Sequence, residues 1–202
     1  MKLYYAPGAC SMSPHIVLHE TGAKFDIVKV DLGTHKTEKG DDYFAINAKG
    51  AVPALQLDNG DVLTEGAVIV QYLGDHAKDS NIMPKAGSME RVRENEWLNW
   101  VAAEFHKPMG SLFNKDMAAK AGDLIKANIG NKLAYLEKHL TKHEYLVGGH
   151  FTAADAYAFT ILGWAPHVGV DISAYKNVGA YLGRIGGRPA VQATLKAEGL
   201  IK

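Results

Sequence analysis

The first part of the chain alternates between the apolar patterns of strands and of helices. Short apolar runs at Lys2–Ala6 and Phe25–Val30 predict strands, and Met12–Thr21, stopped by Gly22, predicts a helix between them. Asp41–Ile46 fits one or two helical turns. A strand-helix-strand unit closes with a right-handed crossover, so the two strands are expected to be parallel.

A predicted hairpin and a further helix follow. The runs Ala54–Leu57 and Asp61–Leu63 are joined by Asp58-Asn59-Gly60, and Asn-Gly accepts the positive φ angles that tight hairpins need. Thr64 then opens a helix that reaches about His76. The order strand, helix, strand, short helix, hairpin, helix is that of a thioredoxin-like domain. We therefore expect an α/β domain with a mixed four-stranded sheet over residues 1–77.

The remaining chain shows no strand pattern. Residues 78–87 are rich in polar residues, Pro and Gly and predict a linker, and residues 88–202 predict an all-helical bundle domain. Thr152 and Asp155 form a capping-box pattern before a segment, Ala153–Trp164, that is apolar almost all round. That segment is expected to be the buried centre of the bundle. Pro189 suits the first turn of the last helix.

Composition excludes several classes of function. Lys plus Arg and Asp plus Glu number 22 each, so the net charge is zero and a nucleic-acid partner is not expected. No apolar stretch approaches the length of a membrane span. The one cysteine, Cys10, cannot form an intrachain disulfide, and the histidines show no metal-ligand spacing. We expect a cytoplasmic protein with a reduced thiol, no bound metal and no membrane partner.

Cys10 is the first candidate for chemistry. The pattern Cys10-Ser11-Met12-Ser13 follows the first strand and begins the first helix, where backbone N–H groups and the helix dipole favour a thiolate. It is a Cys-x-x-Ser motif, so the thiol could bond to a thiol partner but could not close its own disulfide. A buried, inert cysteine is the competing interpretation.

Two further patterns are candidates for binding. Val52-Pro53 precedes a predicted strand, and in thioredoxin-like folds the proline at this place is cis and turns the preceding backbone toward a bound peptide. Glu65-Gly66 opens the next helix, where an anion would meet the helix N-terminus and an ammonium would meet the carboxylate. The carboxylate and the helix N-terminus together suit an α-amino acid head. The plain alternatives are an ordinary trans turn at Val52-Pro53 and an ordinary helix start at Glu65-Gly66.

With these residues in place, the sequence resembles the glutathione transferases, and within them the bacterial beta class, over essentially its whole length. The stretches that carry the resemblance are Lys2-Leu3-Tyr4-Tyr5, Pro7-Gly8-Ala9-Cys10-Ser11, Ala51-Val52-Pro53-Ala54-Leu55, Leu63-Thr64-Glu65-Gly66, Glu96-Trp97-Leu98-Asn99-Trp100, Phe151-Thr152-Ala153-Ala154-Asp155-Ala156-Tyr157 and Ala197-Glu198-Gly199-Leu200. The family implies a homodimeric detoxification enzyme with glutathione as co-substrate and no other cofactor.

The resemblance also implies roles for single residues. Cys10 would meet the glutathione sulfur, Val52 with Pro53 would pair with its cysteinyl backbone, and Glu65 with Gly66 would bind its γ-glutamyl head. His106 would lie near the sulfur as a second catalytic residue. The other residues implied to contact glutathione are Tyr5, His35, Asn99 and Glu104. His35 stands where the family usually has a lysine for the glycyl carboxylate, and the neighbouring Lys36 is the alternative.

Three functions remain open at this point. The first is conjugation of glutathione to small hydrophobic electrophiles, which would lie against Met109, Leu112, Phe113, Trp164 and His167. The second is glutathione-dependent thiol–disulfide exchange through Cys10. The third is a non-catalytic ligand carrier or regulatory protein on the same fold, because a fold does not by itself give a function.

Overall fold

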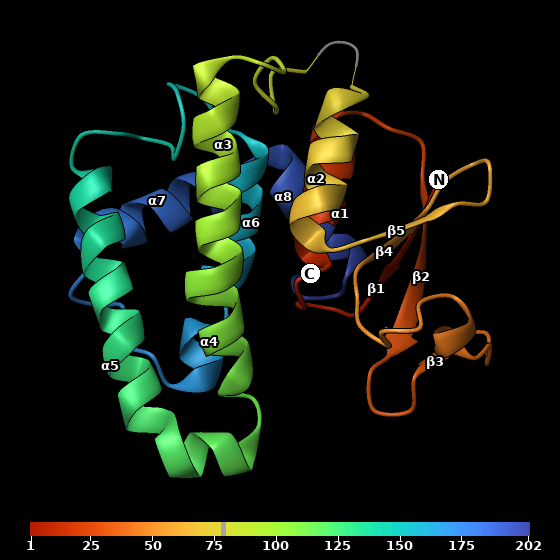
Figure 1. Ribbon diagram of the computed structural model, residues 1–202, viewed down its shortest axis with the longest axis horizontal. Coiled ribbons are helices and arrows are strands. Elements are labelled where there is room, and N and C mark those ends of the chain that lie inside the picture. Colours follow the sequence, from red (N-terminus) through yellow and green to blue (C-terminus); the bar gives the residue numbers. More distant parts are fainter. Residues whose placement is uncertain (78–79) are drawn as a thin grey trace. The chain divides into compact units, whose positions relative to one another are not determined.

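The computed structural model describes residues 1–77 and 80–202, and the chain divides into two units (Figure 1). The first unit comprises residues 1–83 and 188–202, and the second comprises residues 84–187. The division after Met83 falls inside the predicted linker 78–87, of which Lys78 and Asp79 lie outside the described residues. The predicted helical domain 88–202 extends too far, because residues 188–202 fold with the first unit.

A mixed sheet forms the base of the first unit. Its strands follow the spatial order β3-β2-β1-β4-β5, in which β1 and β2 are parallel and the other neighbours are antiparallel. The strands are β1 (Lys2–Tyr5), β2 (Asp26–Asp31), β3 (Lys36–Thr37), β4 (Ala54–Gln56) and β5 (Val62–Thr64). The four predicted strands are confirmed, but the predicted count of four is wrong. Strand β3 has only two residues, too few to produce an alternating pattern.

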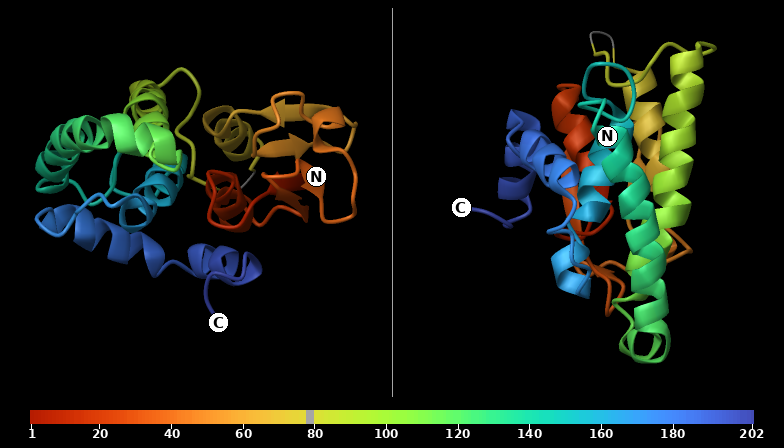
Figure 2. Two further views of the ribbon diagram at one scale, coloured as in Figure 1. Left: turned by 90° about the horizontal axis from the view of Figure 1, so that it is seen from below. Right: turned by 90° about the vertical axis from the view of Figure 1, so that its left-hand side faces the viewer.

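Helices pack beside this sheet. They are α1 (Met12–Glu20), the 3₁₀ turn η1 (Tyr43–Ala45), α2 (Gly66–Asp75) and α8 (Pro189–Ala197). Helix α1 packs against α2 and, on another side, against α8, which is drawn in blue in Figure 2. Leu3, Ile16, Leu55 and Ile69 are fully buried between sheet and helices. This packing of α8 against α1 places the last residues in the first unit.

The second unit contains α3 (Met89–Trp100), the π-helical segment η2 (Val101–His106), α4 (Lys107–Ser111), α5 (Lys115–Leu140), α6 (Ala153–Leu162), the 3₁₀ turn η3 (Ala165–Val168) and α7 (Lys176–Gly186). A π-helical turn therefore separates α3 from α4. Pro108 follows η2 and has no N–H to donate to the Glu104 carbonyl, which favours a wider turn at this point.

The core of the second unit forms around α6, as predicted. Nine of its ten residues are buried, and the Thr152–Asp155 capping box is present at its start. Helix α5 turns Ile129, Leu133 and Leu136 toward the interior. No helix in the part of the chain that the structure describes is both long and apolar enough to cross a membrane.

Candidate functional site

The Cys10 thiol and the Val52 carbonyl lie together in the first unit. Cys10 Sγ donates a hydrogen bond to Val52 O at 3.1 Å, across 42 positions of sequence. The sheet explains the contact, because β1 and β4 are antiparallel neighbours and the end of β1 therefore lies beside the start of β4. The Val52–Pro53 peptide bond is cis, as the fold implied.

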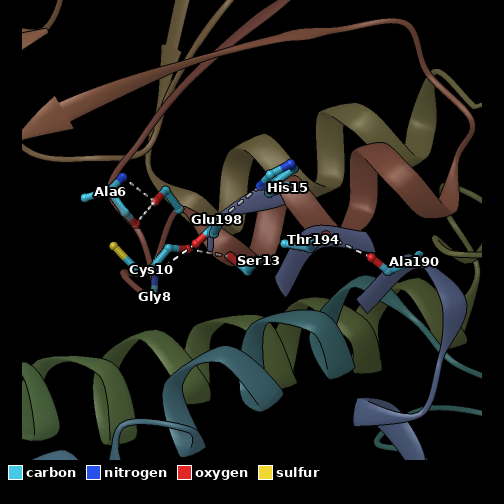
Figure 3. A network of polar contacts seen from close by, with 9 residues as sticks. Ala6, Gly8, Cys10, Ser13, His15, Ala190, Thr194 and Glu198 are labelled. Atoms are coloured by element: carbon cyan, nitrogen blue, oxygen red, sulfur yellow. Dashed lines mark hydrogen bonds and ion pairs between the residues drawn. The ribbon is translucent and has the colours of Figure 1, made fainter. Parts of the chain in front are cut away.

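The loop that carries Cys10 is held by its own polar groups (Figure 3). Ser11 is the N-cap residue of α1, so Cys10 lies one position before the N-cap, at the positive end of the helix. The buried Ser11 Oγ accepts a hydrogen bond from Ala6 N at 3.1 Å, and Ser13 Oγ donates to Cys10 O at 2.9 Å. The half-exposed thiol is thereby placed by a rigid turn rather than by a flexible loop.

A carboxylate from the far end of the chain completes this loop. Glu198 Oε2 accepts the backbone N–H of Gly8 at 2.8 Å, and Glu198 Oε1 lies 2.9 Å from His15 Nδ1 (Figure 3). Both side chains are almost fully buried, at 1% and 0% exposed. Gly8 has a φ of 69°, in the left-handed region that favours glycine. Residues 188–202 are therefore part of the structure around the thiol.

Gly66 begins α2 and Glu65 is its N-cap residue, whereas Thr64, which was predicted to open this helix, ends β5. Glu65 has a φ of 69°, which is uncommon for a residue with a side chain and is often found at functional sites. Its carboxylate pairs with Lys49 Nζ at 2.5 Å, and the same ammonium donates to Thr64 Oγ1 at 3.0 Å. Gly66 is the first helical residue, at an end where backbone N–H groups have no acceptor within the helix. The arrangement offers a carboxylate for an ammonium and amide groups for an anion.

His35 lies against the segment that leads to Val52. Its Nδ1 is 3.1 Å from the Gly50 carbonyl oxygen, and its ring centre is 4.5 Å from that of Phe44. Because a carbonyl only accepts, Nδ1 carries the proton in this contact. Lys36 lies in β3 with an exposed side chain. This position beside the Val52 segment favours His35 over Lys36 as the residue for the glycyl carboxylate.

Tyr5 ends β1 and is almost buried. Burial raises the pKa of its phenol, and the negative charges of Glu198 and Glu38 raise it further. Its ring lies 5.9 Å from that of His15. A contact of Tyr5 with glutathione stays a prediction.

His106 ends the π-helical segment of the second unit. Its Nδ1 lies 2.6 Å from the hydroxyl oxygen of Tyr157, which α6 provides. The imidazole meets the Tyr157 and Trp164 rings edge-on, with centroid distances of 5.7 and 5.2 Å. The side chain is half-buried and is held by named partners, unlike an ordinary surface histidine.

The two other candidates of the second unit have partners of their own. Glu104 Oε2 pairs with Lys132 Nζ at 2.7 Å, and Asn99 Nδ2 donates to the Asn95 carbonyl at 2.8 Å. Asn99 is exposed on α3 and Glu104 is half-buried in η2. Roles for both toward glutathione stay predictions.

The residues expected to contact the electrophile differ in how deeply they are buried. Met109 is fully buried and Leu112 is 6% exposed, so both belong mainly to the core of the second unit. Phe113 is 54% exposed and packs edge-on against Trp164, and His167 is exposed. Trp164 is also buried, at 9% exposed, so Phe113 and His167 are the exposed members of this group. Among residues 1–77 and 80–202 no group of three or more His, Cys, Asp and Glu side chains could hold a metal ion.

Comparison with known proteins decides the family. Residues 8–76 match the family model of the glutathione S-transferase N-terminal domain, and residues 103–189 match that of the C-terminal domain. The chain is 44% identical to glutathione S-transferase GstA of Escherichia coli O157:H7, over 99% of this chain and 100% of that protein. The chain belongs to the glutathione S-transferase family.

Solved structures of glutathione S-transferases agree with this assignment. A bacterial beta class enzyme from Sphingomonas chungbukensis is 48% identical, with a TM-score of 0.96 and full coverage of both chains. A sphingomonad glutathione S-transferase complexed with glutathione is 45% identical, with a TM-score of 0.95 and full coverage of both chains. The expected resemblance to the bacterial beta class is confirmed.

Three residues of this transferase were missed by the sequence analysis as partners of the candidate site. They are Lys49, which pairs with Glu65; Tyr157, which contacts His106; and Glu198, which binds Gly8 and His15. The partners are separated by 16, 51, 190 and 183 positions, and no periodic pattern spans such distances. Tyr157 and Glu198 lie in stretches that carried the family resemblance, which was the one available signal.

Proposed function

We propose that this protein conjugates reduced glutathione to small hydrophobic electrophiles. The observation that carries the proposal is the contact between Cys10 Sγ and Val52 O. It sets a thiol beside a backbone segment at the entrance of β4, where the cysteinyl part of a peptide could pair with Val52. Glutathione is the co-substrate in this proposal, and the transferase needs no other cofactor.

The site would bind glutathione by its two ends. Glu65 would accept the ammonium of the γ-glutamyl group, while Gly66 at the start of α2 would donate to its carboxylate. His35 would meet the glycyl carboxylate. The Lys49 ammonium already occupies the Glu65 carboxylate, so it would have to share this carboxylate with the ligand.

Catalysis in this proposal consists of holding the glutathione sulfur as a thiolate. Lowering a thiol pKa by about two units takes about 2.7 kcal/mol of differential stabilisation. The positive end of α1 and one or two hydrogen bonds, with His106 as one donor, would supply it. The thiol proton passes to solvent, the sulfur forms a bond to carbon, and the leaving group departs with the electron pair.

Initial rates with glutathione and an aryl halide test the proposal. Glu65→Gln is expected to raise KM for glutathione about tenfold, because the ligand ammonium loses a charged partner. Glu96→Gln is the matched control, since Glu96 is a similarly exposed glutamate paired with Arg93. An unchanged KM in Glu65→Gln would remove Glu65 from the binding site. Glutathione binding without turnover of any electrophile would favour the ligand-carrier hypothesis instead.

Thiol–disulfide exchange is the second candidate activity, and the half-exposed Cys10 at the start of α1 favours it. The Cys10 thiolate would attack a glutathionylated substrate, releasing the substrate thiol and leaving glutathione bound to Cys10 by a disulfide. A second glutathione thiolate would then attack this bond, releasing oxidised glutathione and regenerating Cys10. Reductase activity that survives in Cys10→Ala would rule this activity out.

The proposal includes a homodimer that acts in the cytoplasm in detoxification. Its support is the family and a single cysteine suited to a reducing compartment. Light scattering of the purified protein at several concentrations measures the assembly. A molar mass that stays at that of one chain would contradict the dimer.

A further inference from the structure

Lys49 connects the turn before Val52 with the start of α2, within the first unit. Its Nζ donates to Thr64 Oγ1 at 3.0 Å and pairs with Glu65 Oε1 at 2.5 Å. Thr64 and Glu65 directly precede Gly66, the first residue of α2. The Lys49 ammonium therefore lies at the end of α2 where backbone N–H groups favour a carboxylate.

A buried asparagine fixes the backbone that carries this ammonium. Asn47 is 6% exposed, its Nδ2 donates to the Ala51 carbonyl at 2.7 Å, and its Oδ1 accepts the Lys49 N–H at 3.2 Å. The Asn47 carbonyl also accepts the Gly50 N–H at 2.8 Å. Lys49 thus belongs to a defined turn, from which its side chain reaches residues 15 and 16 positions further along the chain.

The ion pair of Lys49 and Glu65 is open to solvent. Their side chains are 56% and 64% exposed. Ion pairs with such exposure contribute little to stability, because water screens both charges. Folding stability therefore gives little reason for this arrangement, and a charged ligand can enter the pair without uncovering a buried charge.

The charges of the pair are complementary to those of an α-amino acid head. Such a head carries an ammonium and a carboxylate on one carbon atom, and Lys49 and Glu65 present the opposite charges side by side. A bound head would give each of the four charges an opposite neighbour. We propose that Lys49 is a specificity-determining residue whose ammonium binds the α-carboxylate of the γ-glutamyl group, while Glu65 accepts the α-ammonium. This inference rests on the proposed function and names the ligand class as γ-glutamyl peptides with an intact α-amino acid head.

Two peptides that differ only in the α-carboxylate test the proposal. They are reduced glutathione and γ-aminobutyryl-cysteinylglycine, and calorimetric titration of the protein measures the Kd of each. Lys49→Met is expected to raise the Kd for glutathione about fivefold, because the α-carboxylate loses a charged donor. The Kd for the peptide without this carboxylate should stay nearly unchanged, so the preference for glutathione should fall by the same factor.

Two further variants serve as controls. Lys49→Arg keeps the positive charge and should bind glutathione within about twofold of the unsubstituted protein. Lys24→Met removes an exposed lysine of the same unit, in the segment between α1 and β2, and should change neither Kd. Tighter binding of glutathione by Lys49→Met would overturn the proposal, since Lys49 would then only compete for Glu65. An equal loss of affinity for both peptides would also overturn it.

The titrations separate this inference from the proposed function. An unsubstituted protein that binds neither peptide would overturn both. Binding of the two peptides with the expected ratios, without turnover of any electrophile, would overturn the proposed conjugation and support the role of Lys49.

Discussion

Glu198 accepts a hydrogen bond from the backbone N–H of Gly8, two residues before Cys10, while its other oxygen contacts His15. This buried carboxylate, at the C-terminal end of α8, thereby connects the loop that carries Cys10 to α1. The side chains of Glu198 and His15 are both buried, so each depends on the other for a hydrogen bond.

The first prediction concerns this carboxylate. Glu198→Ala is expected to lower the free energy of unfolding by about 3–5 kcal/mol, because it removes the buried carboxylate that contacts His15 Nδ1 and accepts from the Gly8 N–H. Denaturant unfolding measures the change. Glu96→Ala, which removes an exposed carboxylate, should stay within about 0.5 kcal/mol. An equally small effect in Glu198→Ala would show that the buried contact contributes little.

Asp155 carries the second prediction. Its capping role alone would be worth about 0.5–2 kcal/mol. The fully buried carboxylate also accepts from Leu146 N at 2.9 Å and from Tyr181 Oη at 2.8 Å, besides Thr152 N. Asp155→Ala is therefore expected to cost about 3–5 kcal/mol, since several buried donors lose one shared acceptor. Asp116→Ala in the first turn of α5 is the control, and equal midpoints for the two variants would contradict the prediction.

The third prediction concerns pH. Burial raises the pKa of Glu94 to about 7, although Ala154 N donates to its carboxylate, and burial raises the pKa of Asp155 to about 6. Both values lie above those of an unfolded chain, so the folded protein binds more protons between about pH 4 and pH 7. Stability is thus largest below this range and is lost as pH rises through it.

The expected loss from Glu94 is about 3 kcal/mol between about pH 5 and pH 7.5. Unfolding curves across this range measure it. Glu94→Gln removes the titrating group and should flatten most of the slope, with the remainder due to Asp155. Stability that increases with pH in the unsubstituted protein would mean that these carboxylates are ionised in the fold.

The fourth prediction concerns His35. His35→Ala is expected to raise the Kd for glutathione about tenfold, because the glycyl carboxylate loses a hydrogen-bond donor. Lys36→Ala is the control and should leave Kd nearly unchanged, since the Lys36 side chain is exposed on β3. Calorimetric titration measures both variants. An equal loss of affinity in the two variants, or none in His35→Ala, would place the contact with the glycyl carboxylate elsewhere.

The sequence by itself determined the local structure and the family. Short apolar runs, Asn59-Gly60 and the Thr152–Asp155 pattern predicted strands, hairpin and cap correctly, because each depends on a few neighbouring residues. Cys10, Val52 and Glu65 were recognised because their motifs are contiguous. The two-residue strand β3 and the π-helical turn before Pro108 left no such pattern.

Tertiary structure alone decided which groups meet. Gly8 and Glu198 are 190 positions apart, His106 and Tyr157 are 51 apart, and α8 folds with the first unit although the sequence placed it in the helical domain. Periodicity shows which face of an element is apolar but not which other element covers it. The partners of a buried polar group follow from that packing, since burial makes each such group find a hydrogen bond within the protein.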